Sequence, residues 1–225
     1  MLAAAAAVLL MLQRPTEPSS TVDTTTARAE GLSYEPSGWA LDTSLGDEAA
    51  ILASIRVDGN TVASMEDFDR QIAGANRVES VTTDVRIRYR DEFVMELAAD
   101  TAVGLDAWSD SASEGGERVL FAESGSLRMA TGPGFDPAFS LAVETPHVRT
   151  EVVGTIFGLD IGADYTCVCC LEGTIRTQQL MEGVEASSLS AGRTWVAKAG
   201  KESLWQIPLV STHHAPLLGL EGYWA

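Results

Sequence analysis

Residues 81–90 read VTTDVRIRYR, and this stretch decides the fold class. From Val85 to Arg90 apolar side chains alternate with arginines. Alternation with a period of two is typical of a β-strand that has one apolar and one polar face. Residues 93–97 (FVMEL) come directly after Asp91-Glu92, so they are the natural partner strand. The stretch therefore predicts a β-hairpin that turns at Asp91-Glu92.

Short runs of the same kind continue along the chain. They cover residues 118–121, 126–129, 139–143, 147–152, 155–161, 166–170, 174–177, 186–189 and 194–197. Many short strands at a spacing of about 8–12 residues indicate an all-β fold, either a sandwich of antiparallel strands or a solenoid-like stack. Only residues 46–55 and 64–73 have a pattern that fits a helix.

Composition excludes several classes of protein. The chain has 225 residues, with 15 Lys and Arg against 32 Asp and Glu, and a net charge of −17. A hydrophobic fraction of 45% with 21% charged residues is ordinary for a globular protein, which excludes collagen-like, coiled-coil and wholly disordered chains. Nucleic acids and anionic lipid surfaces require a basic face, so neither is expected as the main partner.

The N-terminal region differs from the rest. Residues 1–12 (MLAAAAAVLLML) carry no charge. As a helix they would span about 18 Å of a hydrocarbon core that is about 30 Å thick. We interpret them as a truncated transmembrane or signal-anchor segment, with a signal peptide and a buried core helix as alternatives. Residues 13–38, rich in Ser, Thr and Pro, are predicted to be a flexible linker. Residues 39–205 are then the β domain, and residues 206–225 a C-terminal tail.

Four short motifs follow one another after residue 143. They are Glu144-Thr-Pro146, Gly154-Thr-Ile-Phe157, Glu172-Gly173 at the end of a strand, and Ala191-Gly192. Together with the hairpin region of residues 81–103, their order and spacing resemble the FecR domain, over about residues 50–200. Taken singly, they are turn and packing residues: Gly154 is expected at a bend in a strand and Gly173 in a hairpin turn with positive φ.

The resemblance implies a role in signalling. FecR-like proteins are typically single-pass inner-membrane proteins whose periplasmic β domain relays the state of an outer-membrane receptor to a sigma factor. The resemblance therefore implies a periplasmic location, one N-terminal membrane helix, and a receptor signalling domain or a sigma-associated protein as partner. No cytoplasmic sigma-binding segment precedes Met1. We therefore expect either a fragment that begins within the membrane helix or a domain that serves another signal.

The three cysteines lie together in one predicted strand, at positions 167, 169 and 170. Because side chains alternate along a strand, Cys167 and Cys169 share one face and Cys170 lies on the other. The FecR resemblance makes the Cys170 side the inward one. Cys167 and Cys169 are therefore expected to face outward and to react with thiol reagents.

Thiolates and imidazoles are ligands that suit Zn²⁺ or Cu(I). The candidate metal ligands are Cys167, Cys169, His213 and His214, and no other cofactor is expected. Structural thiols beside an exposed histidine pair, and redox-active or inter-chain thiols, are the alternatives. No catalytic motif is recognised, so the main interpretation is a non-enzymatic sensor or interaction domain. A metal- or thiol-dependent binding protein and a hydrolase on a β scaffold are the other hypotheses.

Overall fold

The computed structural model describes residues 37–105, 108, 117–138, 140–201, 206–208, 220 and 223–224. Contacts divide the chain into two units, Met1–Glu30 and Gly31–Ala225, and the fold described below belongs to the second. The predicted membrane segment of residues 1–12 and nearly all of the predicted linker lie outside the described residues. Among the helices of the described ranges, none is both long and apolar enough to cross a membrane.

The strands form two sheets that share one strand, β8 (Arg118–Thr131). In sheet A the order is β1 (Trp39–Asp42), β5 (Val85–Tyr89), β6 (Phe93–Leu97), β8, β11 (Ile156–Ile161), β12 (Tyr165–Glu172), β15 (Arg193–Lys198) and β16 (Gln206–Pro208). In sheet B it is β3 (Asn60–Thr61), β2 (Ile55–Val57), β4 (Arg77–Ser80), β7 (Thr101–Gly104), β8, β9 (Leu141–Glu144), β10 (Val148–Val152), β13 (Thr174–Gln179) and β14 (Ser187–Ser190). Each named pairing is antiparallel except that of β8 with β9.

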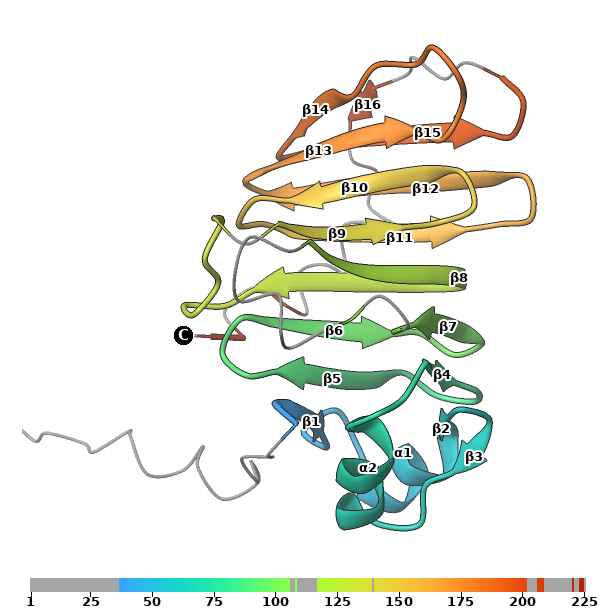
Figure 1. Cartoon of the computed structure of the whole chain (residues 1–225), viewed down its shortest axis with the longest axis vertical. Coiled ribbons are helices and arrows are strands. Elements are labelled where there is room, and N and C mark those ends of the chain that lie inside the picture. Colours follow the sequence, from blue (N-terminus) through green and yellow to red (C-terminus); the bar gives the residue numbers. More distant parts are fainter. Residues whose placement is uncertain are drawn as a thin grey trace, which may run out of the picture. The chain divides into compact units, whose positions relative to one another are not determined.

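The two sheets lie face to face, and their strands are stacked in rungs from β1 to β14 and β15 (Figure 1). The prediction of a mostly β fold is confirmed, and the sandwich and the stack are two aspects of the same arrangement. Two short helices, α1 (Glu48–Ser54) and α2 (Met65–Ile72), lie within the two ranges predicted as helical. The Ser64 side chain caps α2 by accepting a hydrogen bond from the Asp67 amide.

Strand β8 passes from one sheet to the other. Its first half pairs with β7 and β9 in sheet B, and its second half pairs with β6 and β11 in sheet A. Gly125 lies at the change with a φ of +87°, and a Cβ there would overlap Thr101. The sequence predicted two separate strands here. The structure joins them because Gly125 lets a single strand bend between the sheets.

The core lies between the sheets. The hairpin predicted from residues 81–97 is confirmed as β5 and β6, with Tyr89 opposite Phe93. Tyr89 and Phe93 pack with Trp39 and Trp108, with ring centroids 4.7–5.8 Å apart. This aromatic cluster fills the inner space at the β1 end of the stack.

The predicted hairpin at Glu172-Gly173 is wrong, although Gly173 has the expected positive φ of +76°. Strand β12 pairs with β11 and β15, whereas β13 pairs with β10 and β14. The turn therefore carries the chain from sheet A to sheet B. A Cβ on Gly173 would lie 2.6 Å from the Gly154 carbonyl oxygen and 2.9 Å from Cγ2 of Thr155. The close packing of this turn on Gly154 and Thr155 is what requires glycine.

Candidate functional site on the outer face of sheet A

A row of charged side chains crosses the outer face of sheet A. Asp42, Arg86, Glu96 and Arg128 occupy paired positions on β1, β5, β6 and β8. Arg86 donates to Glu96 over 2.8 Å, and the same carboxylate forms an ion pair with Arg128. Arg86 and Glu96 are only 6% and 5% exposed. Burying such charges is costly unless each has a partner of opposite sign, as these have.

An apolar cluster on the same face is covered by residues near the C-terminus. Leu220 is buried in a cluster with Val94, Ala130, Ile156, Cys167 and Cys169, and Tyr223 and Trp224 pack against the same cluster. The Tyr223 ring also lies 5.2 Å from the Arg86 guanidinium. Burial and a hydrogen bond to Asp42 raise the pKa of Tyr223. The predicted tail thus contributes residues that cover the sheet.

The alternation predicted for the three cysteines is confirmed, but the predicted exposure is wrong. Cys170 lies in the core between the sheets, and Cys167 and Cys169 lie on the outer face. Both outer thiols are nevertheless buried, at 5% and 2% exposed, because Leu220 and its neighbours cover them. Local alternation gives the face on which a side chain lies and does not reveal a distant segment that covers it.

The two outer thiols contact each other, with 3.7 Å between their sulfur atoms, and Cys169 Sγ lies 3.4 Å from Thr194 Oγ1. The hydrogen bond with Cys169, together with burial, raises the pKa of Cys167. His213 and His214 lie outside the described residues. Within the described ranges no group of three or more His, Cys, Asp and Glu side chains is placed to hold a metal ion. The four-residue metal site stays a prediction.

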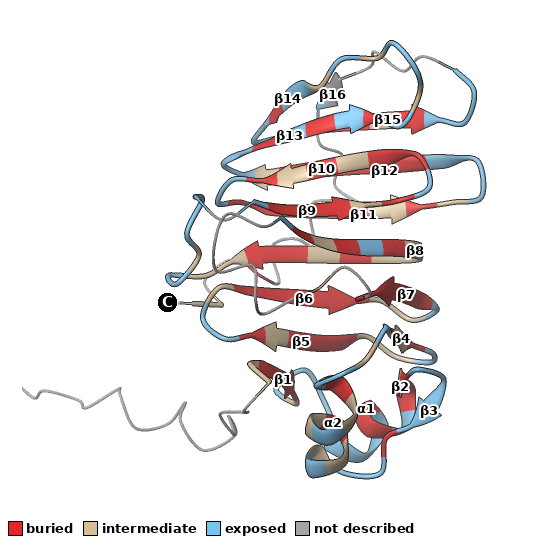
Figure 2. Ribbon diagram, in the orientation of Figure 1, coloured by how far each residue is buried: buried red, intermediate tan, exposed pale blue. Residues whose placement is uncertain are grey.

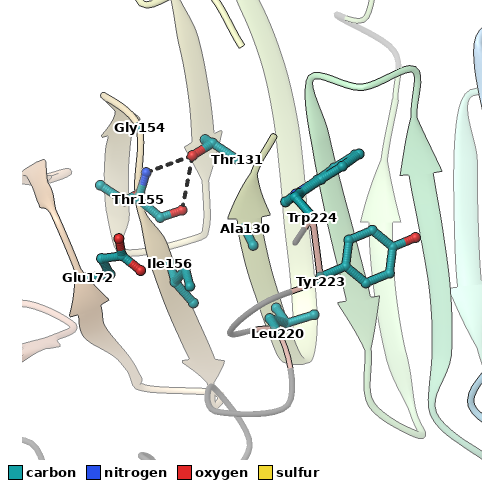
Figure 3. A pocket seen from close by; sticks show the side chains of 9 residues that line it. All are labelled: Ala130, Thr131, Gly154, Thr155, Ile156, Glu172, Leu220, Tyr223 and Trp224. Atoms are coloured by element: carbon teal, nitrogen blue, oxygen red, sulfur yellow. Dashed lines mark hydrogen bonds between the residues drawn. The ribbon is translucent and has the colours of Figure 1, made fainter. Parts of the chain in front are cut away.

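A cavity of about 180 Å³ lies on this face, where β8, β11 and β12 meet the C-terminal residues. It is lined by Ala130, Thr131, Gly154, Thr155, Ile156, Glu172, Leu220, Tyr223 and Trp224. Figure 3 shows Thr155 and Glu172 on one side and Tyr223 and Trp224 on the other, with Ala130 and Ile156 between them. We call this cavity the Trp224 pocket.

Two glycines shape the region around the Trp224 pocket. A Cβ on Gly132 would lie 2.1 Å from the Asp91 carbonyl oxygen and 2.7 Å from the Trp224 ring, so the missing side chain makes room for both. Gly154 has a φ of +88° and lies at the turn between β10 and β11, which agrees with the predicted bend. The Thr155 amide donates to Thr131 Oγ1 over 2.8 Å, which holds this turn against β8 (Figure 3).

The pocket wall carries polar groups with unused hydrogen-bonding capacity. Thr155 Oγ1 and Trp224 Nε1 are buried and have no hydrogen-bond partner among the described residues. Glu172 is exposed at the rim, and its carboxylate forms no ion pair with any residue that the structure describes. These groups can recognise a ligand by charge, hydrogen bonds and aromatic contact. Sequence reasoning read Gly154, Thr155 and Glu172 only as turn residues. The adjacent aromatic pair Tyr223-Trp224 was the available signal that the tail packs.

The comparisons with known proteins agree with the sequence motifs. The family described as FecR protein matches residues 78–176. A solved structure from Parabacteroides distasonis, described as a "putative anti-sigma factor", has a TM-score of 0.51 and 13% identity over 63% of this chain and 64% of that chain. Another from the same organism, described in the same words, has a TM-score of 0.49 and 12% identity over 61% and 62%.

This chain thus matches less than two thirds of the length of either solved chain. At 13% identity the likeness shows the fold alone. No curated protein matches the sequence. The family match extends from Val78 in β4 to Arg176, halfway along β13, and therefore contains the β8 crossover, the Gly154 turn and Glu172. Residues 78–176 therefore match the FecR domain, which confirms the resemblance found in the sequence over this part of the chain.

Proposed function

We propose that this chain is a signalling protein that regulates a sigma factor through contacts with other proteins. The observation that carries the proposal is the FecR domain match at residues 78–176, set in a β stack whose fold is similar to that of a protein described as a "putative anti-sigma factor". Fold alone does not determine function, so the family match is the stronger support.

We further propose that the β domain lies outside the cytoplasm, is held at the inner membrane by an N-terminal helix, and relays an envelope signal. The apolar residues 1–12 and the Ser/Thr/Pro-rich stretch after them support this arrangement. The proposed partners are a receptor signalling domain and a sigma-associated protein. The protein acts by binding rather than by catalysis.

The charge on the outer face of sheet B supports a protein partner rather than a nucleic acid. Three of its arginines are matched by carboxylates, through ion pairs of Arg77 with Glu79 and Glu123, of Arg149 with Glu117 and Glu144, and of Arg176 with Glu151. Arg56 donates to main-chain carbonyls instead. A nucleic-acid partner would require unpaired basic side chains along such a face.

Gene deletion tests the proposed function. Transcription from reporters for each sigma factor of the source genome is measured with and without the gene, and after complementation with the full chain. We expect at least one reporter to change several-fold and to return on complementation. Reporters that all stay unchanged would refute sigma regulation. A topology reporter fused at Ala225 that is active only in the cytoplasm would refute the proposed location.

A metal-dependent role for Cys167 and Cys169 is a second candidate. Their sulfur atoms lie 3.7 Å apart. This is close to the edge of a tetrahedral site with Zn–S bonds of about 2.3 Å, which is about 3.8 Å. Metal binding would displace the thiol protons. Elemental analysis of the purified chain, and of a variant with His213 and His214 both changed to Ala, tests it: bound metal that is lost in the variant supports the four-residue site, and a metal-free chain contradicts it.

A further inference from the structure

We propose that the Trp224 pocket receives an arginine side chain of the partner protein and anchors that partner on the outer face of sheet A. The inference rests on the proposed function in that it requires a protein partner. It is carried by the pocket's size, its charge and its unpaired polar groups.

The size of the pocket fits one side chain. Its volume is about 180 Å³, whereas sites for drug-sized ligands have volumes of about 300–1,000 Å³. Interfaces commonly place a single anchor residue in a pocket of this kind, and arginine is among the residues enriched at such positions. The partner's remaining contacts would lie on the surface around the rim.

The charge of the pocket favours a cation. Glu172 at the rim has no ion pair among the described residues, and the chain as a whole carries a net charge of −17. Tyr223 and Trp224 form the opposite side (Figure 3). A cation between a carboxylate and aromatic rings gains both a charge-assisted hydrogen bond and cation–π attraction.

The hydrogen-bonding groups favour arginine over lysine. The planar guanidinium can donate to the Glu172 carboxylate and at the same time to Thr155 Oγ1, which is buried in the pocket wall and has no partner among the described residues. It can also lie flat against an aromatic ring. The ammonium of lysine is compact and strongly hydrated and does not present donors in one plane.

The remaining unpaired group, Trp224 Nε1, is a donor and requires an acceptor. A guanidinium has none, so we assign this contact to a main-chain carbonyl of the partner next to its arginine. The Trp224 N–H needs an acceptor, and the Thr155 hydroxyl can accept from a donor. A peptide segment that contains arginine offers both. Buried polar groups without partners cost free energy in the unbound protein, and a ligand that pairs them recovers it.

Titration of the full chain with N-acetyl-arginine-N-methylamide tests the site. The readout is the indole N–H resonance of Trp224, assigned by its loss in Trp224→Phe. We expect a saturable shift with the arginine compound. The citrulline analogue, which has the same shape without the charge, is expected to bind about tenfold more weakly or not at all. Equal binding of the citrulline compound, or no shift with the arginine compound, would overturn the inference.

Two carboxylate variants localise the effect. Glu172→Gln is expected to weaken binding of the arginine compound about tenfold. Glu182→Gln removes one charge from an exposed residue between β13 and β14, away from the pocket lining, and is expected to leave binding unchanged. Equal weakening in both variants would mean that the compound responds only to the net charge, which contradicts a site at Glu172.

Thr155→Val separates recognition from a structural role. The substitution removes the unpaired hydroxyl and keeps the side-chain shape, and the hydrogen bonds of Thr155 with Thr131 that use the Thr155 main chain are retained. We therefore expect an unchanged or higher melting temperature together with several-fold weaker binding of the arginine compound. Unchanged binding would show that the hydroxyl does not contact the ligand and would overturn its assigned role.

Binding of the arginine compound and the sigma-factor reporters are independent measurements, and together they distinguish this inference from the proposed function. Binding of the arginine compound with unchanged sigma-factor reporters would refute the proposed function and leave the arginine site standing. Reporters that respond to the gene, with a chain that does not bind the compound, would refute the arginine site alone.

Discussion

The outer faces of the two sheets carry the same kind of side chain in different surroundings. On sheet A, Arg86 and Glu96 belong to a row of ion pairs that is almost wholly buried beside the C-terminal residues. On sheet B, Arg149 pairs with Glu144 and Glu117 in contact with solvent, and Arg176 is 60% exposed. Figure 2 shows the contrast between β6, which is buried along its length, and β13, where buried and exposed residues alternate.

The difference shows that the covering segment determines what an ion pair contributes. In contact with water an ion pair contributes about 0–1 kcal/mol, because solvent already stabilises both charges. When other residues bury the pair, the stability of each charge depends on its partner, because removing one partner leaves the other charge buried without it. The C-terminal residues therefore turn an ordinary polar face into one that is sensitive to substitution.

The largest effect is expected when one partner of a buried pair is removed. Glu96→Gln takes the shared negative charge away from Arg86 and Arg128, which keep Asp42 at 3.8 Å and Asp84 at 3.2 Å, and we expect a loss of about 3 kcal/mol in the free energy of unfolding. The matched change on sheet B, Glu144→Gln, is expected to cost less than about 1 kcal/mol. Urea denaturation of both variants measures the difference. Similar losses would show that the two faces do not differ in solvation.

The second effect tests whether Trp224 is part of the cover. Gly132→Ala places a methyl group 2.1 Å from the Asp91 carbonyl oxygen and 2.7 Å from the indole ring, so both the backbone near Asp91 and the ring must move, at a cost of about 1–3 kcal/mol. Gly74→Ala is the control, because nothing lies within 4 Å of its Cβ position. Thermal unfolding gives the stabilities, and the Trp224 indole resonance reports the position of the ring. A Trp224 indole resonance that is the same in Gly132→Ala as in wild type would mean that Trp224 does not pack there.

The sequence was informative where local rules decide the structure. Alternation predicted the pairing of β5 with β6, and it placed Cys170 on the opposite face from Cys167 and Cys169, as the structure has them. Other local patterns in the sequence predicted both helices and the positive φ of Gly173. These features depend on side-chain periodicity and on glycine conformation, which neighbouring residues determine.

Long-range packing was not predictable in the same way. The turn at Gly173 leads to the other sheet, because the partners of β13 are β10 and β14 rather than the preceding strand. The burial of Cys167 depends on Leu220, which lies about fifty residues further along the chain. The Trp224 pocket also depends on long-range packing, because it brings Thr155 and Glu172 together with the C-terminal residues. A period of two carries no information about such contacts.

A third prediction uses the thiols to measure the cover directly. In the native protein all three cysteines are buried and should react slowly with a small thiol reagent. Leu220→Ala opens the outer face of sheet A, so we expect several-fold faster labelling of Cys167 and Cys169, with Cys170 unchanged. Leu180→Ala, at a side chain that is 49% exposed, is the control. Mass spectrometry identifies the labelled residue. Faster labelling of Cys170 alone would contradict the register of β12.

The smallest effect is a loss of stability at alkaline pH. Burial raises the pKa of Cys170 from 9.0 to about 11, and burial with the Asp42 contact raises the pKa of Tyr223 above its usual 10.0. When the folded-state pKa of an acid is raised, the unfolded chain releases its proton first. The contribution to stability is therefore complete below the unfolded-state pKa and declines as the pH rises toward the folded-state value.

We accordingly expect the free energy of unfolding to fall between about pH 9 and pH 11. Tyr223→Phe keeps a ring beside Arg86 and removes the titrating hydroxyl, so the decline above about pH 10 should become shallower in this variant. Glu144→Gln on sheet B is the control and should leave the slope unchanged, because the Glu144 carboxylate pairs with Arg149 on the other sheet from Tyr223. Urea denaturation at a series of pH values measures the slopes. Identical slopes in wild type and Tyr223→Phe would show that the Tyr223 hydroxyl is solvated, and would contradict its place in the cover over the charged row.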